Sequence, residues 1–282
     1  MTLSIITINR NNAHGLKKTI ESVINQTFKE FEFIVIDGAS TDGSLDIIKQ
    51  YSDCITYWIS EPDKGIYNAM NKGISKAKGN YLQFLNSGDC LFQTDTLEKV
   101  FAQSHRGDVI YGNAMCVSSE KSELFKPTQK ISLSYFYQGF GINHQSSFFK
   151  KSFFDKNHLY DENFRIVSDW MNYFSLILRG AIFEYIDMTI VDYDMMGISS
   201  DMTNFQKQER VQCLQKVIPL HIKPDYDELF TLRNRIYTDS LYPVYYSLRT
   251  NRRLTKRILK VLLYVLSLFD RILDKIVNLF HQ

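Results

Sequence analysis

The sequence predicts an α/β fold with a mostly parallel, Rossmann-like sheet flanked by helices, because its first 120 residues alternate between two apolar periodicities. Short apolar runs with strand character lie at 3–8, 31–36, 55–59, 81–85 and 108–112. Between them, apolar residues recur at helical spacing over 16–24, 44–51, 65–77 and 96–102. This order is typical of parallel strands joined by helices that cover both faces of the sheet.

Composition places the chain among ordinary globular proteins. Of its 282 residues, 44% are hydrophobic and 23% are charged, and the net charge of +2 does not suggest a nucleic-acid partner. The four scattered cysteines form no CxxC pair, which favours free thiols in a reducing compartment. No signal peptide and no apolar run of about 18 residues is visible, so we expect a cytoplasmic protein.

Polar side chains end three of the predicted strands. Thr7 and Asn9 end the first, Asp37 ends the second, and Ser87 and Asp89 follow the fourth. Ligands of such sheets bind beyond the carboxyl ends of the strands. Asp37 can accept a hydrogen bond from a base or a ribose hydroxyl, and Asp89 can coordinate Mg²⁺ or Mn²⁺. Each aspartate alone could only cap a turn, but the three together indicate a nucleotide site.

Two common nucleotide-binding motifs are absent from the sequence. It contains no GxxxxGK[ST], and no GxGxxG follows the first strand. Their absence argues against a P-loop NTPase and a dinucleotide-dependent enzyme.

Four segments resemble glycosyltransferase family 2, whose members invert the anomeric centre and have the GT-A fold. They read SIITINRN, FEFIVIDGASTDGS, EPDKGIYNAMNKGISKAKGNYLQFLNSGD and a later SDW. The resemblance spans about residues 2–200 and is most specific over 61–89. It is to the branch that builds bacterial surface polysaccharides of the O-antigen, capsule or colanic-acid type. It implies transfer of a hexose or N-acetylhexosamine from a nucleotide-diphosphate sugar, with UDP the commonest nucleotide, to a saccharide acceptor, which can be polyprenyl-diphosphate-linked.

The resemblance also implies roles for particular residues on the donor side. Thr7 and Asn9 would line the nucleotide, Asp37 would meet the base, and Asp63 would lie near the base or ribose. Asn71, in the NxG position, would lie near the donor.

The metal motif of the family, usually written DxD, is altered here. It reads Ser87-Gly88-Asp89, so the first carboxylate is missing. Asp89 is the carboxylate that usually reaches the metal, so Mn²⁺ or Mg²⁺ remains the expected cofactor.

An inverting transfer needs a base that removes the proton of the incoming hydroxyl. The family places this base in a short acidic motif at the start of a helix, and the matching residue is Asp169. A structural role at a helix N-terminus is the alternative for Asp169. His144, in the stretch NHQS, could contact the diphosphate or the acceptor, or could be a hydrogen-bonded core residue.

Three aromatic or loop positions could also face the substrates. Trp170 and the aromatic run 135–137 could contact a sugar, although packing in the core is the favoured interpretation for both. Residues 196–199 match a family loop that could close over the diphosphate, with one glycine of that loop replaced.

The last thirty residues predict a separate amphipathic helix. Six cations fall within twelve positions without one acid: Arg249, Arg252, Arg253, Lys256, Arg257 and Lys260. Apolar residues then recur at steps of three and four. Such a helix can lie in the surface of an anionic membrane, or can pack on the catalytic domain or on a second subunit, as in a homodimer. The first option predicts a peripheral protein at the inner face of the cell membrane.

These observations predict a domain organisation and leave two other functions open. We expect a GT-A catalytic domain over 1–200, with a nucleotide-sugar half (1–117) and an acceptor half (118–200). A helical connecting region (201–250) and the basic helix (251–282) follow. The alternatives are a non-catalytic nucleotide-sugar-binding module, which the missing carboxylate allows, and a nucleotidyltransferase, which would usually have a glycine-rich loop after the first strand.

Overall fold

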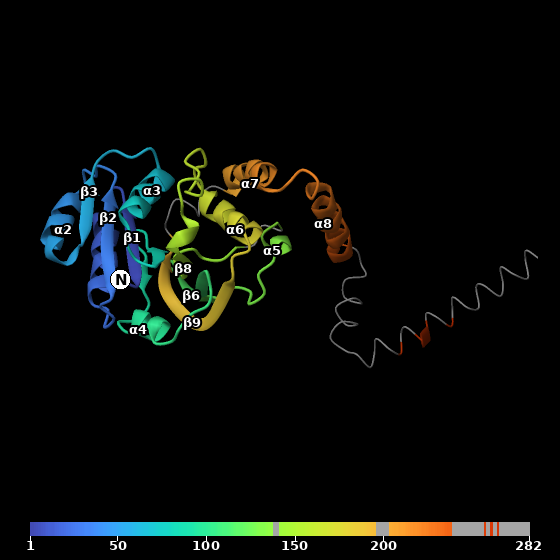
Figure 1. Cartoon of the computed structure of the whole chain (residues 1–282), viewed down its shortest axis with the longest axis horizontal. Helices are drawn as coiled ribbons and strands as arrows, with labels where there is room; N and C mark the ends of the chain where they lie inside the picture. The colour runs from blue at the N-terminus through green and yellow to red at the C-terminus, as the bar shows by residue number, and fades with distance from the viewer. Residues whose placement is uncertain (138–140, 196–202, 239–256, 258–259, 262–263, 265–282) are drawn as a thin grey trace, which may run out of the picture. The chain divides into compact units, whose positions relative to one another are not determined.

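A computed structural model of the chain describes residues 1–137, 141–195, 203–238, 257, 260–261 and 264 (Figure 1). The chain divides into two compact units, residues 1–220 and residues 221–282. The first unit contains the sheet and every predicted site residue.

The sheet of the first unit has nine described strands, in the order β3-β2-β1-β4-β8-β6-β9-β5, with β7 paired to β6. The strands are β1 (Leu3–Asn9), β2 (Phe31–Asp37), β3 (Tyr57–Ser60), β4 (Tyr81–Phe84), β5 (Cys90–Leu91), β6 (Val109–Val117), β7 (Ser122–Phe125), β8 (Ser147–Lys150) and β9 (Phe183–Asp194). Strands β3, β2, β1 and β4 are parallel. The register of β1 on β2 sets Asn9 beside Asp37.

The predicted α/β class is confirmed, and the antiparallel part of the sheet begins at β8. This strand runs antiparallel to both β4 and β6, while β9 runs parallel to β6. The expected acceptor half begins with β7, whose four residues are all exposed. This strand reads SELF and buries neither face, so it lacks the alternation of polar and apolar residues that marks a half-buried strand.

Helices cover the two faces of the sheet with separate cores. The helices of this unit are α1 (Ala13–Ile24), α2 (Ser44–Gln50), α3 (Ile66–Lys76), α4 (Thr96–Phe101), α5 (Leu133–Tyr137), α6 (Ser168–Leu178) and α7 (Thr203–Val217). Helices α3, α5 and α6 pack into one core, and α1, α2 and α4 pack into the other. Helix α1 shows how the sequence forms such an element: Asn12 caps it by accepting a hydrogen bond from the N–H of Gly15, and Leu16, Ile20 and Val23 form its buried face.

Helix α7 supports the segment that leads into α6. Glu209 of α7 is buried and accepts hydrogen bonds from the backbone N–H groups of Arg165 (2.6 Å) and Ile166 (2.9 Å). Two charge-assisted bonds at a buried site fix this segment firmly. Helix α6 therefore begins, and carries Asp169, at a defined position.

The second unit contains α8 (Lys223–Thr238). Of the predicted terminal helix, only four residues are described, all helical: Arg257, Lys260, Val261 and Tyr264. Its remainder and the loop at 196–199 lie outside the described residues. None of the helices in the described part of the chain has the length and apolar character that crossing a bilayer requires.

Candidate active site

Asp37 organises the turn that follows β2. Its Oδ1 accepts hydrogen bonds from Asn9 Nδ2 (2.7 Å) and Ser40 Oγ (2.6 Å). Its Oδ2 accepts from the Ser40 N–H (3.0 Å) and Ser60 Oγ (2.6 Å). Burial alone would raise the pKa of Asp37, but these donors outweigh it and hold the pKa below its ordinary value. The carboxylate is thus ionised and held rigidly at the strand end.

Thr7 and Asn9 reach the same edge of the sheet from β1. The hydroxyl of the fully buried Thr7 donates to the carbonyl of Leu85, beyond the end of β4. Asn9 Oδ1 is buried and has no hydrogen-bond partner among the described residues. An unsatisfied buried acceptor is unusual, and a ligand N–H or hydroxyl would satisfy it.

Asp63 lies against the turn after Asp37. A Cβ placed on Gly38 would overlap with Asp63 Oδ2, so the Asp63 carboxylate lies directly against this glycine. Asp63 Oδ1 accepts a hydrogen bond from the N–H of Gly65 (3.0 Å). The structure therefore brings Asp63 next to Asp37, as expected if both face one nucleoside.

The side-chain amide of Asn71 makes its hydrogen bonds within the protein. Its Nδ2 donates to the Tyr160 carbonyl (2.9 Å) and to Glu162 Oε1 (2.9 Å), and its Oδ1 accepts from the Tyr160 N–H (3.0 Å). These bonds tie α3 to the segment before α6. The sequence did not predict these hydrogen bonds. A contact between Asn71 and the donor sugar nucleotide stays a prediction.

Asp89 is a buried carboxylate without a cationic partner in the described structure. It is 3% exposed, and it accepts hydrogen bonds from Gln145 Nε2 (3.0 Å) and from the Asp194 N–H (2.9 Å). Burial raises the pKa of Asp89 to about 7, although both hydrogen bonds lower it. A carboxylate so poorly stabilised in its charged form favours a bound cation.

The surroundings of Asp89 fit a hard divalent cation. Gly88 has a φ of 109° and its Cβ position would lie 2.9 Å from Asp194 Oδ2, so a second carboxylate lies beside the motif. Asn86 Oδ1 is buried and makes no hydrogen bond to any described residue. Across the described residues, no three acidic, histidine or cysteine side chains gather in a metal cluster. A cation here would complete its shell with phosphate oxygens and water, as Mg²⁺ usually does. Ser87 supplies no carboxylate, and its carbonyl accepts a hydrogen bond from Asn12.

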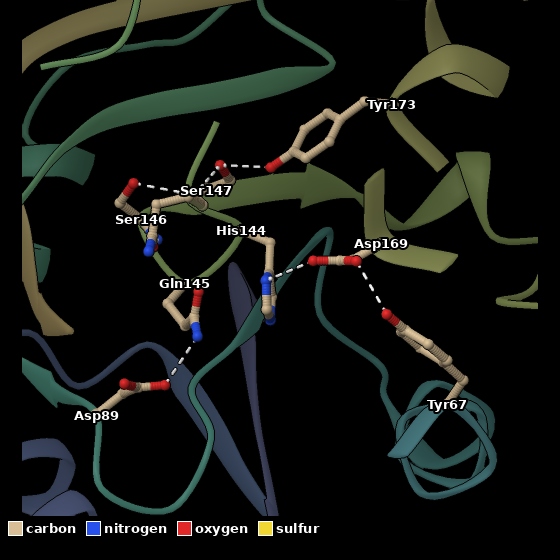
Figure 2. Close-up of polar contacts among 9 residues, drawn as sticks. Tyr67, Asp89, His144, Gln145, Ser146, Ser147, Asp169 and Tyr173 are labelled. Carbon is tan, nitrogen blue, oxygen red and sulfur yellow. Dashed lines mark hydrogen bonds and ion pairs between the residues drawn. The ribbon is translucent and has the colours of Figure 1, made fainter. Parts of the chain in front are cut away.

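Asp169 lies in the first turn of α6 and is bonded on both oxygens (Figure 2). Tyr67 donates its hydroxyl to Oδ1 (2.9 Å), and His144 Nδ1 lies 3.1 Å from Oδ2. Burial would raise the pKa of Asp169, but the hydrogen bonds and charge of His144, with help from Tyr67, keep it below its ordinary value. Asp169 is therefore an ionised carboxylate with two fixed partners.

One short segment joins the two carboxylates. Two consecutive residues of this segment contact different carboxylates: Gln145 contacts Asp89, and His144 contacts Asp169 (Figure 2). The segment is held by Ser147, whose hydroxyl bonds Tyr173 of α6 (3.0 Å). Gln145 lies inside the stretch NHQS and Tyr67 inside the segment 61–89, but neither was singled out, and no sequence signal marked Asp194.

The aromatic residues singled out in the sequence pack in the core. Trp170 is 6% exposed, with its ring 4.7 Å from that of Phe174 and the Arg210 guanidinium 5.1 Å above it. Phe136, at the centre of the run 135–137, is fully buried. Trp170 and Phe136 therefore have no exposed ring face for a sugar, whereas Tyr135 and Tyr137 are half-buried.

Comparison with known proteins identifies the family. The model for glycosyl transferase family 2 matches residues 4–175, well over half of the chain. This chain belongs to glycosyltransferase family 2. The glycosyltransferase is 36% identical over 210 residues to an uncharacterized glycosyltransferase of Mycobacterium tuberculosis, a match covering 71% of this chain and 77% of the relative.

Solved structures show the same fold at low identity. S. aureus TarS 1–349 in complex with UDP-GlcNAc matches with a TM-score of 0.58 and 19% identity, over 69% of this glycosyltransferase and 58% of that chain. The mannosyltransferase PcManGT from Pyrobaculum calidifontis, in complex with GDP-Man and Mn²⁺, matches with a TM-score of 0.57 and 15% identity, over 89% and 79%. The expected GT-A fold of this family 2 glycosyltransferase is confirmed.

Proposed function

We propose that this family 2 enzyme transfers a hexose or N-acetylhexosamine from a nucleoside-diphosphate sugar to a hydroxyl of a saccharide acceptor, with inversion at the anomeric carbon. The observation that supports this most is the pair Asp89 and Asp169, held by consecutive residues of one segment. Burial raises the pKa of Asp89 to about 7, whereas bonded partners lower the pKa of Asp169. Two acids whose environments push their pKa values apart are suited to different roles.

Asp89 belongs to the donor side in this proposal. Asp89, with Asp194 and Asn86 nearby, would hold Mn²⁺ or Mg²⁺, which supplies neutralisation of the charge on the departing diphosphate. The ordered turn of Asp37, with Asn9 and Asp63 beside it, would bind the nucleoside. The UDP-GlcNAc and GDP-Man complexes of the neighbouring structures support a sugar nucleotide, with UDP as the first choice.

Asp169 belongs to the acceptor side. Asp169 and the side chains bonded to it would supply the base, which has to act from the face opposite the leaving diphosphate because inversion requires attack from that face. His144 contacts Asp169, and the next residue, Gln145, contacts Asp89 on the donor side. Asp89 follows β4, at the edge of the sheet where ligands of parallel sheets bind, and Asp169 lies in the first turn of α6.

The acceptor in this proposal is a saccharide linked to polyprenyl diphosphate, in the synthesis of a bacterial surface polysaccharide such as O-antigen. The six cations at 249–260, at the start of the amphipathic helix predicted at 251–282, support this, because cations beside an apolar face suit an anionic membrane surface. The protein would then act as a peripheral enzyme at the inner face of the cell membrane. Packing of the same helix in a homodimer is the alternative.

The test is a panel of UDP-, GDP- and dTDP-linked sugars with the purified full chain and Mn²⁺. A donor that binds the folded state raises the melting temperature by mass action, and turnover releases its nucleoside diphosphate. Stabilisation without release, even with saccharide acceptors present, would instead indicate a binding module, as the serine at position 87 allows. Stabilisation by a nucleoside triphosphate alone would point to a nucleotidyltransferase.

A further inference from the structure

The imidazole of His144 has one nitrogen that the described part of the chain leaves without a partner. Its Nδ1 lies 3.1 Å from Asp169 Oδ2, and because an ionised carboxylate has no proton to give, Nδ1 is the donor. In the neutral ring, Nε2 then carries the lone pair. This Nε2 is buried and makes no hydrogen bond to any described residue. A buried acceptor without a partner can accept a hydrogen bond from the hydroxyl of a ligand.

The ring lies between the two halves of the site. In Figure 2, His144 lies between Asp89 and Asp169. Asp89 marks the donor diphosphate in the proposed function, and Asp169 marks the acceptor side. A hydroxyl that attacks the anomeric carbon has to approach between them, which is where His144 lies.

The hydrogen bonds that Asp169 accepts make it a weak base for the incoming hydroxyl. Its two oxygens already accept from Tyr67 and His144, and these bonds stabilise the charged form of the carboxylate. The same two bonds suit it to orient an imidazole and to stabilise its positive charge. A neutral imidazole is also better matched than a carboxylate to proton transfer near neutral pH.

We propose that His144 Nε2 is the atom that accepts the proton of the attacking hydroxyl, with Asp169 as its positioning partner; this rests on the proposed transferase function. As the acceptor oxygen forms its bond to the anomeric carbon, the O–H electron pair stays on that oxygen and the proton moves to Nε2. The bond between the anomeric carbon and the diphosphate breaks, and the diphosphate leaves with the electron pair. Asp169 remains ionised beside the imidazolium, which later loses the proton to water.

The other histidine–acid pairs differ in the respect that matters. His105 has Nδ1 on Glu184 (2.8 Å), and its Nε2 is paired with the Val100 carbonyl (2.6 Å), so both nitrogens are used. His158 has Nδ1 on Asp155 (2.7 Å) but is 35% exposed at the surface. His158→Gln is therefore a matched control for the loss of a histidine–aspartate pair outside the site.

The experiment compares full-chain His144→Gln, His144→Ala and the control His158→Gln, using the sugar nucleotide that turns over in the panel above. We expect His144→Gln to lower kcat by about 10²-fold or more. The melting-temperature shift with UDP and Mn²⁺ should stay at the wild-type value, which shows that fold and donor site are intact. Added imidazole should raise the rate of His144→Ala in proportion to its concentration, and His158→Gln should match wild type.

Two results would overturn the assignment. The first is a kcat for His144→Gln within tenfold of wild type, and the second is a His144→Ala rate that does not respond to imidazole. Either would indicate that Asp169, and not His144, accepts the proton. Either result would leave the transferase function standing. Failure of that function itself would show separately, as absent release of nucleoside diphosphate by the wild-type chain.

Discussion

Replacing Asp89 by asparagine should stabilise the metal-free protein while abolishing transfer. The carboxyl group is buried, and its pKa is raised from 3.8 to about 7 in the folded chain. A difference of about three pKa units at about 1.4 kcal/mol each makes the ionised Asp89 cost about 4 kcal/mol of unfolding free energy above pH 7. Asparagine has the same shape without the charge, and it can still accept from the Asp194 N–H.

The expected gain is smaller than this full cost. In the Asp89→Asn variant the new amide would face Gln145 Nε2, a donor, so one hydrogen bond has to rearrange at a cost of about 1 kcal/mol. We expect the variant to be more stable than wild type by about 2–3 kcal/mol at about pH 8 in EDTA. For a unit of this size, that corresponds to a rise in melting temperature of roughly 5–10 °C.

The pH dependence gives the sign of the effect. Because the folded-state pKa lies above the ordinary value, folded Asp89 binds more protons than unfolded Asp89 between about pH 4 and pH 7. Its contribution to stability is therefore full below about pH 4 and is lost as the pH rises through 7. The gap between variant and wild type should grow by about 2 kcal/mol from about pH 5.5 to pH 8.

Denaturant unfolding in EDTA across this pH range measures the gap, and Asp53→Asn, on the exposed surface, controls for loss of one charge. The control should change stability by less than about 0.5 kcal/mol at every pH. UDP with Mn²⁺ should raise the melting temperature of wild type and not that of Asp89→Asn. A variant less stable than wild type at pH 8, or a gap that does not change with pH, would refute the burial argument.

Three further outcomes are expected. Asp169→Asn should lower kcat by about 10²-fold or more and leave the UDP-dependent shift in melting temperature unchanged. The reason is that a neutral amide can neither accept the proton nor stabilise a positive charge on His144. Lost donor affinity with a normal rate at saturation would place Asp169 in the donor site. Glu209→Ala should destabilise the fold by about 2–4 kcal/mol in denaturant unfolding, because two buried N–H groups lose their acceptor, and an effect below about 0.5 kcal/mol would contradict that support of α6. Truncation after Tyr246 should abolish salt-sensitive sedimentation with anionic vesicles and leave activity on water-soluble acceptors; equal sedimentation of both forms would remove the terminal helix from membrane binding.

The first half of the fold was predictable because its signals are local. Each parallel strand is a short apolar run, each connecting helix has its own apolar face, and the carboxyl ends of such strands meet at one edge. The register of β1 on β2 then sets Asn9 beside Asp37, the two polar residues expected to share a ligand. The antiparallel half was less predictable, because β7 is exposed and β8 pairs with two strands distant in sequence.

The sequence by itself determined the order of elements, the family and the acidic residues at the strand ends and at the start of α6. Only the tertiary structure decided what surrounds those acids. Asp89 meets Asp194, 105 residues away, and Asp169 meets Tyr67, 102 residues away. Of the two consecutive residues between these acids, His144 contacts Asp169 and Gln145 contacts Asp89. Such contacts depend on strand order and helix docking, and the pKa of each acid depends on its burial and on the donors that reach it. Local spacing of residues encodes neither.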